Sequence, residues 1–69
     1  MKENYFGKRL KDLRTEHKLS QRAMGKEFGV CNQTVSFWES GSREPDLDTL
    51  KKIASFFDVS IDYLLGLED

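Results

Sequence analysis

The segment LSQRAMGKEFGVCNQTVSFWESG, residues 19–41, decides the fold of this chain. Met24 and Phe28 stand one helical turn apart, which is the spacing of an apolar stripe on an amphipathic helix. Ser20 precedes them where an N-cap is expected, because its hydroxyl can accept a hydrogen bond from the free N–H groups of a helix start. Gly29 can end the helix in the left-handed conformation. The pattern predicts a short helix between Ser20 and Gly29.

A second short helix is expected over residues 31–40. Val35 and Trp38, three residues apart, form its inward-facing pair, and Gly41 can end it. Gly25 lies four residues before the turn between the two helices, where we expect a side chain to collide with the facing helix. Two short helices joined by a tight turn on a helical core form the arrangement in which one helix supports another in the major groove of DNA.

Three further helices are expected around this pair because apolar residues recur at helical spacing. Their inward-facing residues are Phe6, Leu10 and Leu13 over about residues 4–18, Leu47, Leu50, Ile53, Ala54 and Phe57 after a cap at Asp46, and Ile61, Leu64 and Leu65 between Ser60 and Gly66. Apolar and polar residues do not alternate over four or more positions between turn signals, so we expect no strand. The sequence predicts an all-α, compact five-helix bundle.

Length and composition restrict what such a chain can be. Its 69 residues predict one domain over 1–69, with no room for a two-domain enzyme. The single cysteine, Cys31, excludes an internal disulfide framework and fits a reducing cytosol. No apolar run approaches the roughly 20 residues that a membrane span needs. We therefore expect a cytoplasmic protein.

The motifs resemble the Cro/CI-type (XRE-like) helix-turn-helix family of phage and bacterial transcriptional regulators. The matching stretches are Leu10 to Arg14, Leu19 to Gln21, Phe28 to Val30, Thr34 to Ser36, Trp38-Glu39, Gly41, Leu47 to Leu50, Ile53-Ala54 and Val59 to Leu65. The resemblance covers about residues 6–65, which we expect to be the core of the domain. It implies a lambda-repressor-like DNA-binding fold, in which the helices flanking Gly29 form the helix-turn-helix.

The resemblance also implies roles for individual residues. Base contacts would come from the outer face of helix 31–40, and the residues are Asn32, Gln33, Ser36 and Phe37. Amides can pair with adenine, a serine can serve either base, and an aromatic ring can pack on a thymine methyl group. Phosphate contacts would come from Gln21, Arg22, Thr34 and Arg43. Arg14 and Glu39 would form a structural ion pair between the first and third helices, with two solvated charges as the alternative.

Two positions depart from the family pattern. Cys31 stands where Ser or Thr usually caps the recognition helix, so we expect a poorly capped helix start. Phe37 stands where Lys, Arg or Gln is common, so the preferred operator sequence does not follow from the resemblance. Affinity must then come from outside this nearly uncharged helix.

The net charge of −1 argues at first against DNA as a partner, but the charges are unevenly distributed. Residues 1–43 hold nine Lys and Arg against five Asp and Glu, whereas residues 44–69 hold two against seven. The part expected to face DNA therefore carries +4 and the remainder −5. This polarity orients the approach to DNA without giving strong non-specific affinity.

We expect a sequence-specific regulator, a repressor rather than an activator, with double-stranded DNA and a palindromic operator as partner. Phe56 should turn outward and, with Tyr63 and Leu67, form a two-fold contact in a homodimer at least on DNA. Three alternatives stay open: an antitoxin that also binds a protein, the N-terminal part of a longer ligand-sensing repressor, and a purely protein-binding module.

Other chemistries find little support in the sequence. His17 has no second His or Cys at ligand spacing, so we expect a surface histidine and no metal. Cys31 could act as a redox switch, although no resolving cysteine accompanies it. No catalytic constellation or phosphate-binding glycine loop is present in the sequence, so we expect no enzyme and no cofactor.

Overall fold

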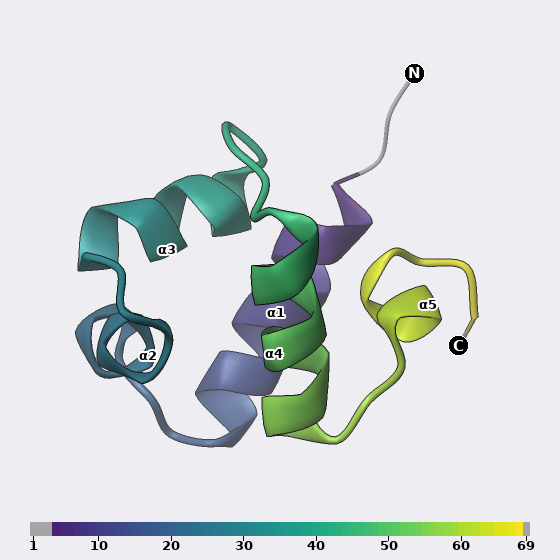
Figure 1. Cartoon of the computed structure of the whole chain (residues 1–69), viewed down its shortest axis with the longest axis horizontal. Helices are drawn as coiled ribbons and strands as arrows, with labels where there is room; N and C mark the ends of the chain where they lie inside the picture. Colours follow the sequence, from purple (N-terminus) through teal and green to yellow (C-terminus); the bar gives the residue numbers. More distant parts are fainter. Residues whose placement is uncertain (1–3, 69) are drawn as a thin grey trace.

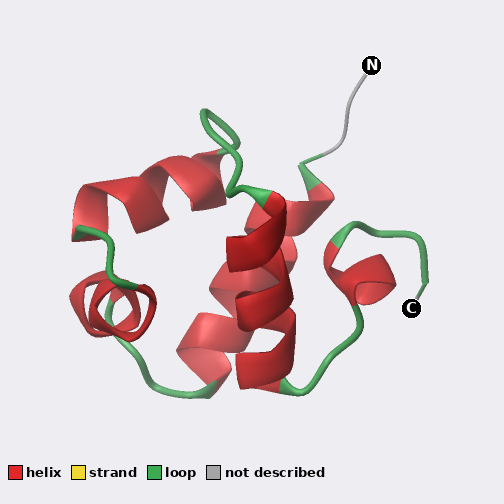
Figure 2. Cartoon of the chain, viewed as in Figure 1, coloured by secondary structure: helices red, strands yellow, loops and turns green. Residues whose placement is uncertain are grey.

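Five helices make up the part of the chain that the computed structural model describes, residues 4–68. They are α1 (Tyr5–Glu16), α2 (Gln21–Phe28), α3 (Asn32–Ser40), α4 (Leu47–Phe57) and α5 (Ile61–Leu64). Only loops and turns join them, and no strand is found in these residues (Figure 2). The prediction of an all-α, five-helix fold is confirmed.

The predicted caps fix where the helices begin and end. The side chains of Ser20, Asp46 and Ser60 each accept a hydrogen bond from the backbone N–H three residues later. Gly29 (φ 71°) and Gly41 (φ 85°) end α2 and α3 in the left-handed conformation, where a side chain would be strained. The α2–turn–α3 unit therefore begins and ends close to the predicted positions.

One core joins the helices, with α4 lying across α1 and α5 at the opposite side from α2 (Figure 1). Its buried apolar residues are Leu10, Leu13, Met24, Val35, Trp38, Leu50, Ile53, Ala54, Phe57 and Leu64. Two inward predictions are wrong. Leu47 is 75% exposed because it is the first residue of α4, and Leu65 is 42% exposed because it follows the last residue of α5. Phe6, Phe28 and Ile61 pack on the core only partly buried.

Two glycines allow backbones to come close together. A Cβ at Gly25 would meet the carbonyl oxygen of Val30 at 2.5 Å. The obstacle is thus the backbone of the α2–α3 turn, whereas the sequence suggested the facing helix. A Cβ at Gly7 would overlap the carbonyl oxygen of Glu39, so this buried glycine lets α1 cross α3 in direct contact.

Candidate nucleic-acid interface

The helix α3 has one buried side and one exposed side. Val35 and Trp38 are buried in the core. The four predicted base-contacting residues are all exposed, and these are Asn32, Gln33, Ser36 and Phe37. Because they occupy the side of a helix opposite its buried residues, the structure brings their side chains to one outer face. This face carries amides, a hydroxyl and an aromatic ring, and no charge.

The loop after α3 folds back on the end of that helix. The backbone N–H groups of Ser42 and Arg43 donate to the carbonyl oxygen of Phe37, at 3.0 and 3.3 Å. The guanidinium of Arg43 lies over the Phe37 ring, 5.2 Å from its centroid, at the range of a cation–π contact. Arg43, a predicted phosphate contact, is thus held beside Phe37, a predicted base contact.

Arg14 and Glu39 join α1 to α3. The Nε of Arg14 donates to one carboxylate oxygen of Glu39 at 2.5 Å and Nη2 to the other at 3.2 Å. The Arg14 side chain is 11% exposed and that of Glu39 is 6% exposed, so this two-point pair is largely shielded from water. The third guanidinium nitrogen, Nη1, donates to the carbonyl of Leu19 at the entry to α2.

Glu39 also contacts α2 and the start of α1. Gln21 donates from Nε2 to Oε1 of Glu39 at 3.1 Å. The side-chain amide of Asn4 donates to the Glu39 backbone carbonyl at 3.0 Å, while its oxygen accepts from the N–H of Gly7. One residue of α3 therefore sets the position of that helix against both α1 and α2.

The other predicted phosphate contacts lie near the start of α2 and on α3. Gln21 is half-buried and donates one amide N–H to Glu39 of α3, so its side chain lies between α2 and α3. Its second amide N–H has no partner among residues 4–68. Arg22 is exposed one residue further on. Thr34 is half-buried, and its hydroxyl lies 3.3 Å from the sulfur of Cys31.

Cys31 caps α3 without a side-chain cap hydrogen bond, as expected for a poor cap. The hydrogen bond with the Thr34 hydroxyl lowers the pKa of the exposed Cys31 thiol. His17 is exposed and packs its ring edge-on against Phe57, with Nδ1 2.8 Å from the Leu13 carbonyl. Within residues 4–68, His, Cys, Asp and Glu form no group suited to hold a metal ion.

The three predicted dimer residues do not form one patch in the described chain. Phe56 is 41% exposed and packs edge-on against Phe28 of α2, with 5.5 Å between ring centroids. Tyr63 instead lies under the guanidinium of Arg9 of α1, at 4.4 Å, and the exposed Leu67 follows α5. Phe56 therefore packs beside α2 and Tyr63 of α5 packs beside α1, while α2 and α5 occupy opposite sides of the molecule in Figure 1.

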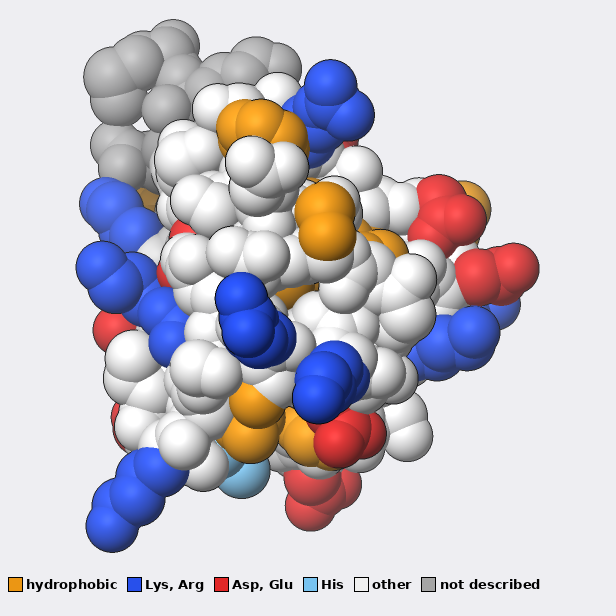
Figure 3. All heavy atoms as spheres, turned by 90° about the vertical axis from the view of Figure 1, so that its left-hand side faces the viewer, with side chains coloured by type: hydrophobic (Ala, Val, Ile, Leu, Met, Phe, Trp, Pro, Cys, Tyr) orange, Lys and Arg blue, Asp and Glu red, His pale blue; other side chains and the backbone are white. Residues whose placement is uncertain are grey.

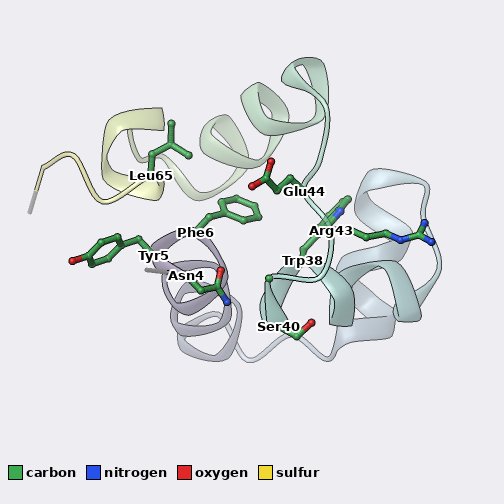
Figure 4. A pocket seen from close by; sticks show the side chains of 9 residues that line it. Asn4, Tyr5, Phe6, Trp38, Ser40, Arg43, Glu44 and Leu65 are labelled. Carbon is green, nitrogen blue, oxygen red and sulfur yellow. The ribbon is translucent and has the colours of Figure 1, made fainter. Parts of the chain in front are cut away.

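A hollow of about 320 Å³ lies between the start of α1 and the loop after α3. Its walls include Phe6, Trp38 and Leu65, with Glu44 on its rim. Figure 4 shows the Glu44 side chain turned toward this hollow and the Arg43 guanidinium pointing away from it. Arg43 therefore lines the hollow, but its guanidinium lies over the Phe37 ring on the α3 outer face.

The sequence did not reveal the contacts of Asn4, Gly7 and Arg9. Asn4 carried a detectable signal, since Asn is a favoured N-cap at the start of an amphipathic helix. Arg9 donates from Nη1 to the carbonyls of Tyr63 and Glu68, at 2.8 and 2.6 Å, and so fastens the turn after α5 to α1. Nothing in the local pattern around Gly7 or Arg9 indicates these distant partners.

Charge is unevenly distributed over the side of the molecule that carries α2 and α3. In Figure 3, Lys and Arg side chains lie across the middle and along the left edge, with others at the top and right, whereas Asp and Glu side chains lie mainly at the right edge and the bottom. Three charged residues of the sequence count, Lys2, Glu3 and Asp69, lie outside the described residues.

Of the helices in residues 4–68, none has the length and apolar character to cross a membrane.

Comparison with known proteins matches this chain to helix-turn-helix proteins. A family model described as helix-turn-helix matches residues 10–64. YobD, an uncharacterized HTH-type transcriptional regulator of Bacillus subtilis, is 39% identical over 64 residues, which cover 93% of this chain and 57% of that protein. ImmR, an HTH-type transcriptional regulator of the same organism, is 38% identical over 64 residues, covering 93% of this chain and 50% of ImmR.

A solved structure shares the fold. The crystal structure of the c2 repressor of Salmonella phage P22, in complex with a synthetic operator, superposes with a TM-score of 0.84 at 35% identity. The match covers 91% of this chain and 96% of that one. The chain spans about half the length of the first curated relatives that it matches.

Proposed function

Because the chain belongs to the helix-turn-helix family, we propose that it binds double-stranded DNA as a sequence-specific transcriptional regulator, and that it acts as a repressor. The observation that carries the proposal is the outer face of α3, on which four exposed side chains stand opposite a buried anchor. The relatives support it, since they include a transcriptional regulator and a repressor solved in complex with a synthetic operator. The proposal implies a protein that works in the cytoplasm, where its DNA partner would lie, and it includes no catalytic role.

In this proposal α3 lies in the major groove and reads base edges. The amides of Asn32 and Gln33 can make two-point contacts with adenine, and Ser36 can bond either donor or acceptor groups. Phe37 would pack on a thymine methyl or a sugar. Its orientation is restricted by Arg43, which lies over the ring.

Contacts to the DNA backbone would fix the register of α3 in the groove. We assign these to Gln21, Arg22, Thr34 and Arg43, which flank the outer face on α2, α3 and the following loop. The positive excess of the N-terminal part of the chain turns this side toward DNA. Phosphate contacts of this kind support binding to any sequence, whereas the α3 side chains select among sequences.

We further propose a homodimer on a palindromic operator, because two half-sites about one helical turn apart require a symmetric protein. Phe56 is the first candidate for the two-fold contact, and Tyr63 with Leu67 is a second candidate on another surface. Sedimentation of Phe56→Ser and Leu67→Ser with operator DNA separates the two. The variant that lies in the contact should lose the dimer, and a profile unchanged in both would remove both assignments.

The proposed function is tested by selecting bound duplexes from genomic fragments and then measuring two variants on the selected duplex. Gln33→Ala should cost about 1–3 kcal/mol on the selected duplex and relax the preference at one base pair. Arg43→Ala should weaken binding to all sequences and flatten the dependence on salt. Equal losses of Gln33→Ala on selected and random DNA would refute the base-reading role. Absence of any salt-dependent DNA binding by the unchanged protein would refute the function itself.

A further inference from the structure

A small cleft of about 230 Å³ opens between three helices beside the outer face of α3. It is lined by Lys11 of α1, by Gln21 of α2, and by Ser36, Glu39 and Ser40 of α3. Ser36 also belongs to the proposed base-reading face. The cleft therefore joins that face to α1, a helix to which no contact with DNA has been assigned above.

The charge in this cleft favours an anion. The carboxylate of Glu39 is the only acidic group among the cleft-lining residues, and both of its oxygens accept hydrogen bonds from Arg14. This two-point pair balances the negative charge at the floor of the cleft. Lys11 is exposed, and no carboxylate in residues 4–68 forms an ion pair with its ammonium. Among the residues that line the cleft, the Lys11 ammonium is therefore the one charge that no opposite charge neutralises.

Hydrogen-bond donors surround the same space. Gln21 directs one amide N–H to Glu39, so its second N–H is available. The hydroxyl of Ser36 has no hydrogen-bond partner in the described part of the chain, whereas that of Ser40 already donates to the last turn of α3. An ammonium, an amide N–H and a hydroxyl converging on one cleft form a donor set suited to phosphate oxygens.

We propose that this cleft receives a phosphate of the DNA backbone, and that Lys11 makes the principal contact from α1. The proposal rests on the function proposed above, because the cleft borders the face of α3 that would enter the groove. It adds a third helix to the interface. It also places a phosphate next to Glu39, so that bound DNA would touch the residue that fixes α3 against its neighbours.

The test compares Lys11→Ala, Lys11→Arg and Lys51→Ala by fluorescence anisotropy on the selected duplex and on random DNA over a range of salt concentrations. Lys51 is the matched control, because it is an exposed lysine of α4 in the acidic part of the chain. Lys11→Ala should weaken binding to both duplexes by a similar factor, roughly 3- to 10-fold at 0.1 M salt, and lower the salt slope by about 0.9. Lys11→Arg should keep the wild-type slope.

Each outcome decides the proposal. It is overturned if Lys11→Ala keeps the same slope and affinity as Lys51→Ala, or if its loss is confined to one base pair. In both cases the wild-type protein still binds DNA, and the proposed function stands. If the wild-type protein shows no salt-dependent binding, both proposals fail together. Circular dichroism of Lys11→Ala should match wild type, and Lys11→Gln repeats the comparison with a longer side chain.

Discussion

Separating Arg14 from Glu39 should remove much of the stability of this domain. The two side chains are 11% and 6% exposed and share two hydrogen bonds, so a single truncation leaves the other charge buried without its partner. Breaking a buried pair in this way costs about 3–5 kcal/mol. A domain of this size holds only about 3–10 kcal/mol in total. Arg14→Ala or Glu39→Ala should therefore be close to unfolded at room temperature.

Replacing both partners should cost much less than the sum of the single losses. In Arg14→Ala/Glu39→Ala, no unpaired charge remains in the interior. The coupling energy should therefore reach about 1–3 kcal/mol. Glu39→Gln is the milder single variant, since its amide can still accept from Gln21 while the charge is lost.

Urea unfolding monitored by tryptophan fluorescence measures these free energies directly. Trp38 is the only tryptophan of the chain and is buried next to Glu39, so its emission should report loss of the α1–α3 contact. The measurement is best made at 10 °C for the weakest variants, with far-UV circular dichroism as a second probe of the same transition. Additive losses in the double variant, or single losses below about 1 kcal/mol, would show that Arg14 and Glu39 act as two solvated charges.

Three further outcomes are expected from substitutions away from this pair. Gly7→Ala should destabilise the fold by about 1–3 kcal/mol in urea unfolding, because its Cβ overlaps the Glu39 carbonyl, and an unchanged midpoint would contradict that close approach. Cys31→Ser should raise the melting temperature by roughly 2–8 °C, since a serine can cap α3 where the thiol does not; a lower melting temperature would count against it. Hydrogen bonding from the side chain and backbone of Thr49 lowers the pKa of Asp46 below its ordinary value of 3.8. The ionised Asp46 carboxylate therefore stabilises the folded state above pH 3.8, and this stabilisation is lost as the pH falls through the lowered pKa. The stability of wild type relative to Asp46→Asn, which can cap but does not titrate, should therefore decline in acid, and a pH-independent difference would contradict this.

The local pattern of the sequence predicted the parts of the fold that depend on neighbouring residues. Caps at Ser20, Asp46 and Ser60 and left-handed glycines at Gly29 and Gly41 act within one helical turn, so their signals lie next to the structure they determine. The same holds for the two sides of α3, which follow from helical spacing alone.

Contacts between distant segments were harder to predict. Gly7 and Glu39 lie 32 positions apart in the sequence, and they meet only because α1 and α3 cross. A glycine inside a helix gives no sign of such a partner. The exposure of Leu47 shows the same limit, because periodicity assigns a helix face but not how far the neighbouring helices extend over it. The pairing of Arg14 with Glu39 was anticipated through the family resemblance and not through spacing.

The buried side of α3 holds this helix in the fold, whereas its exposed side is the one proposed to bind DNA. Val35, Trp38 and Glu39 attach the helix to the rest of the domain, while Asn32, Gln33 and Ser36 take no part in packing the core. Substitutions at these three positions should therefore cost little stability, and under the proposed function they would change the DNA sequence that is preferred. Phe37 is less free to change, because Arg43 lies over its ring and a new residue there would also affect the proposed phosphate contact of Arg43.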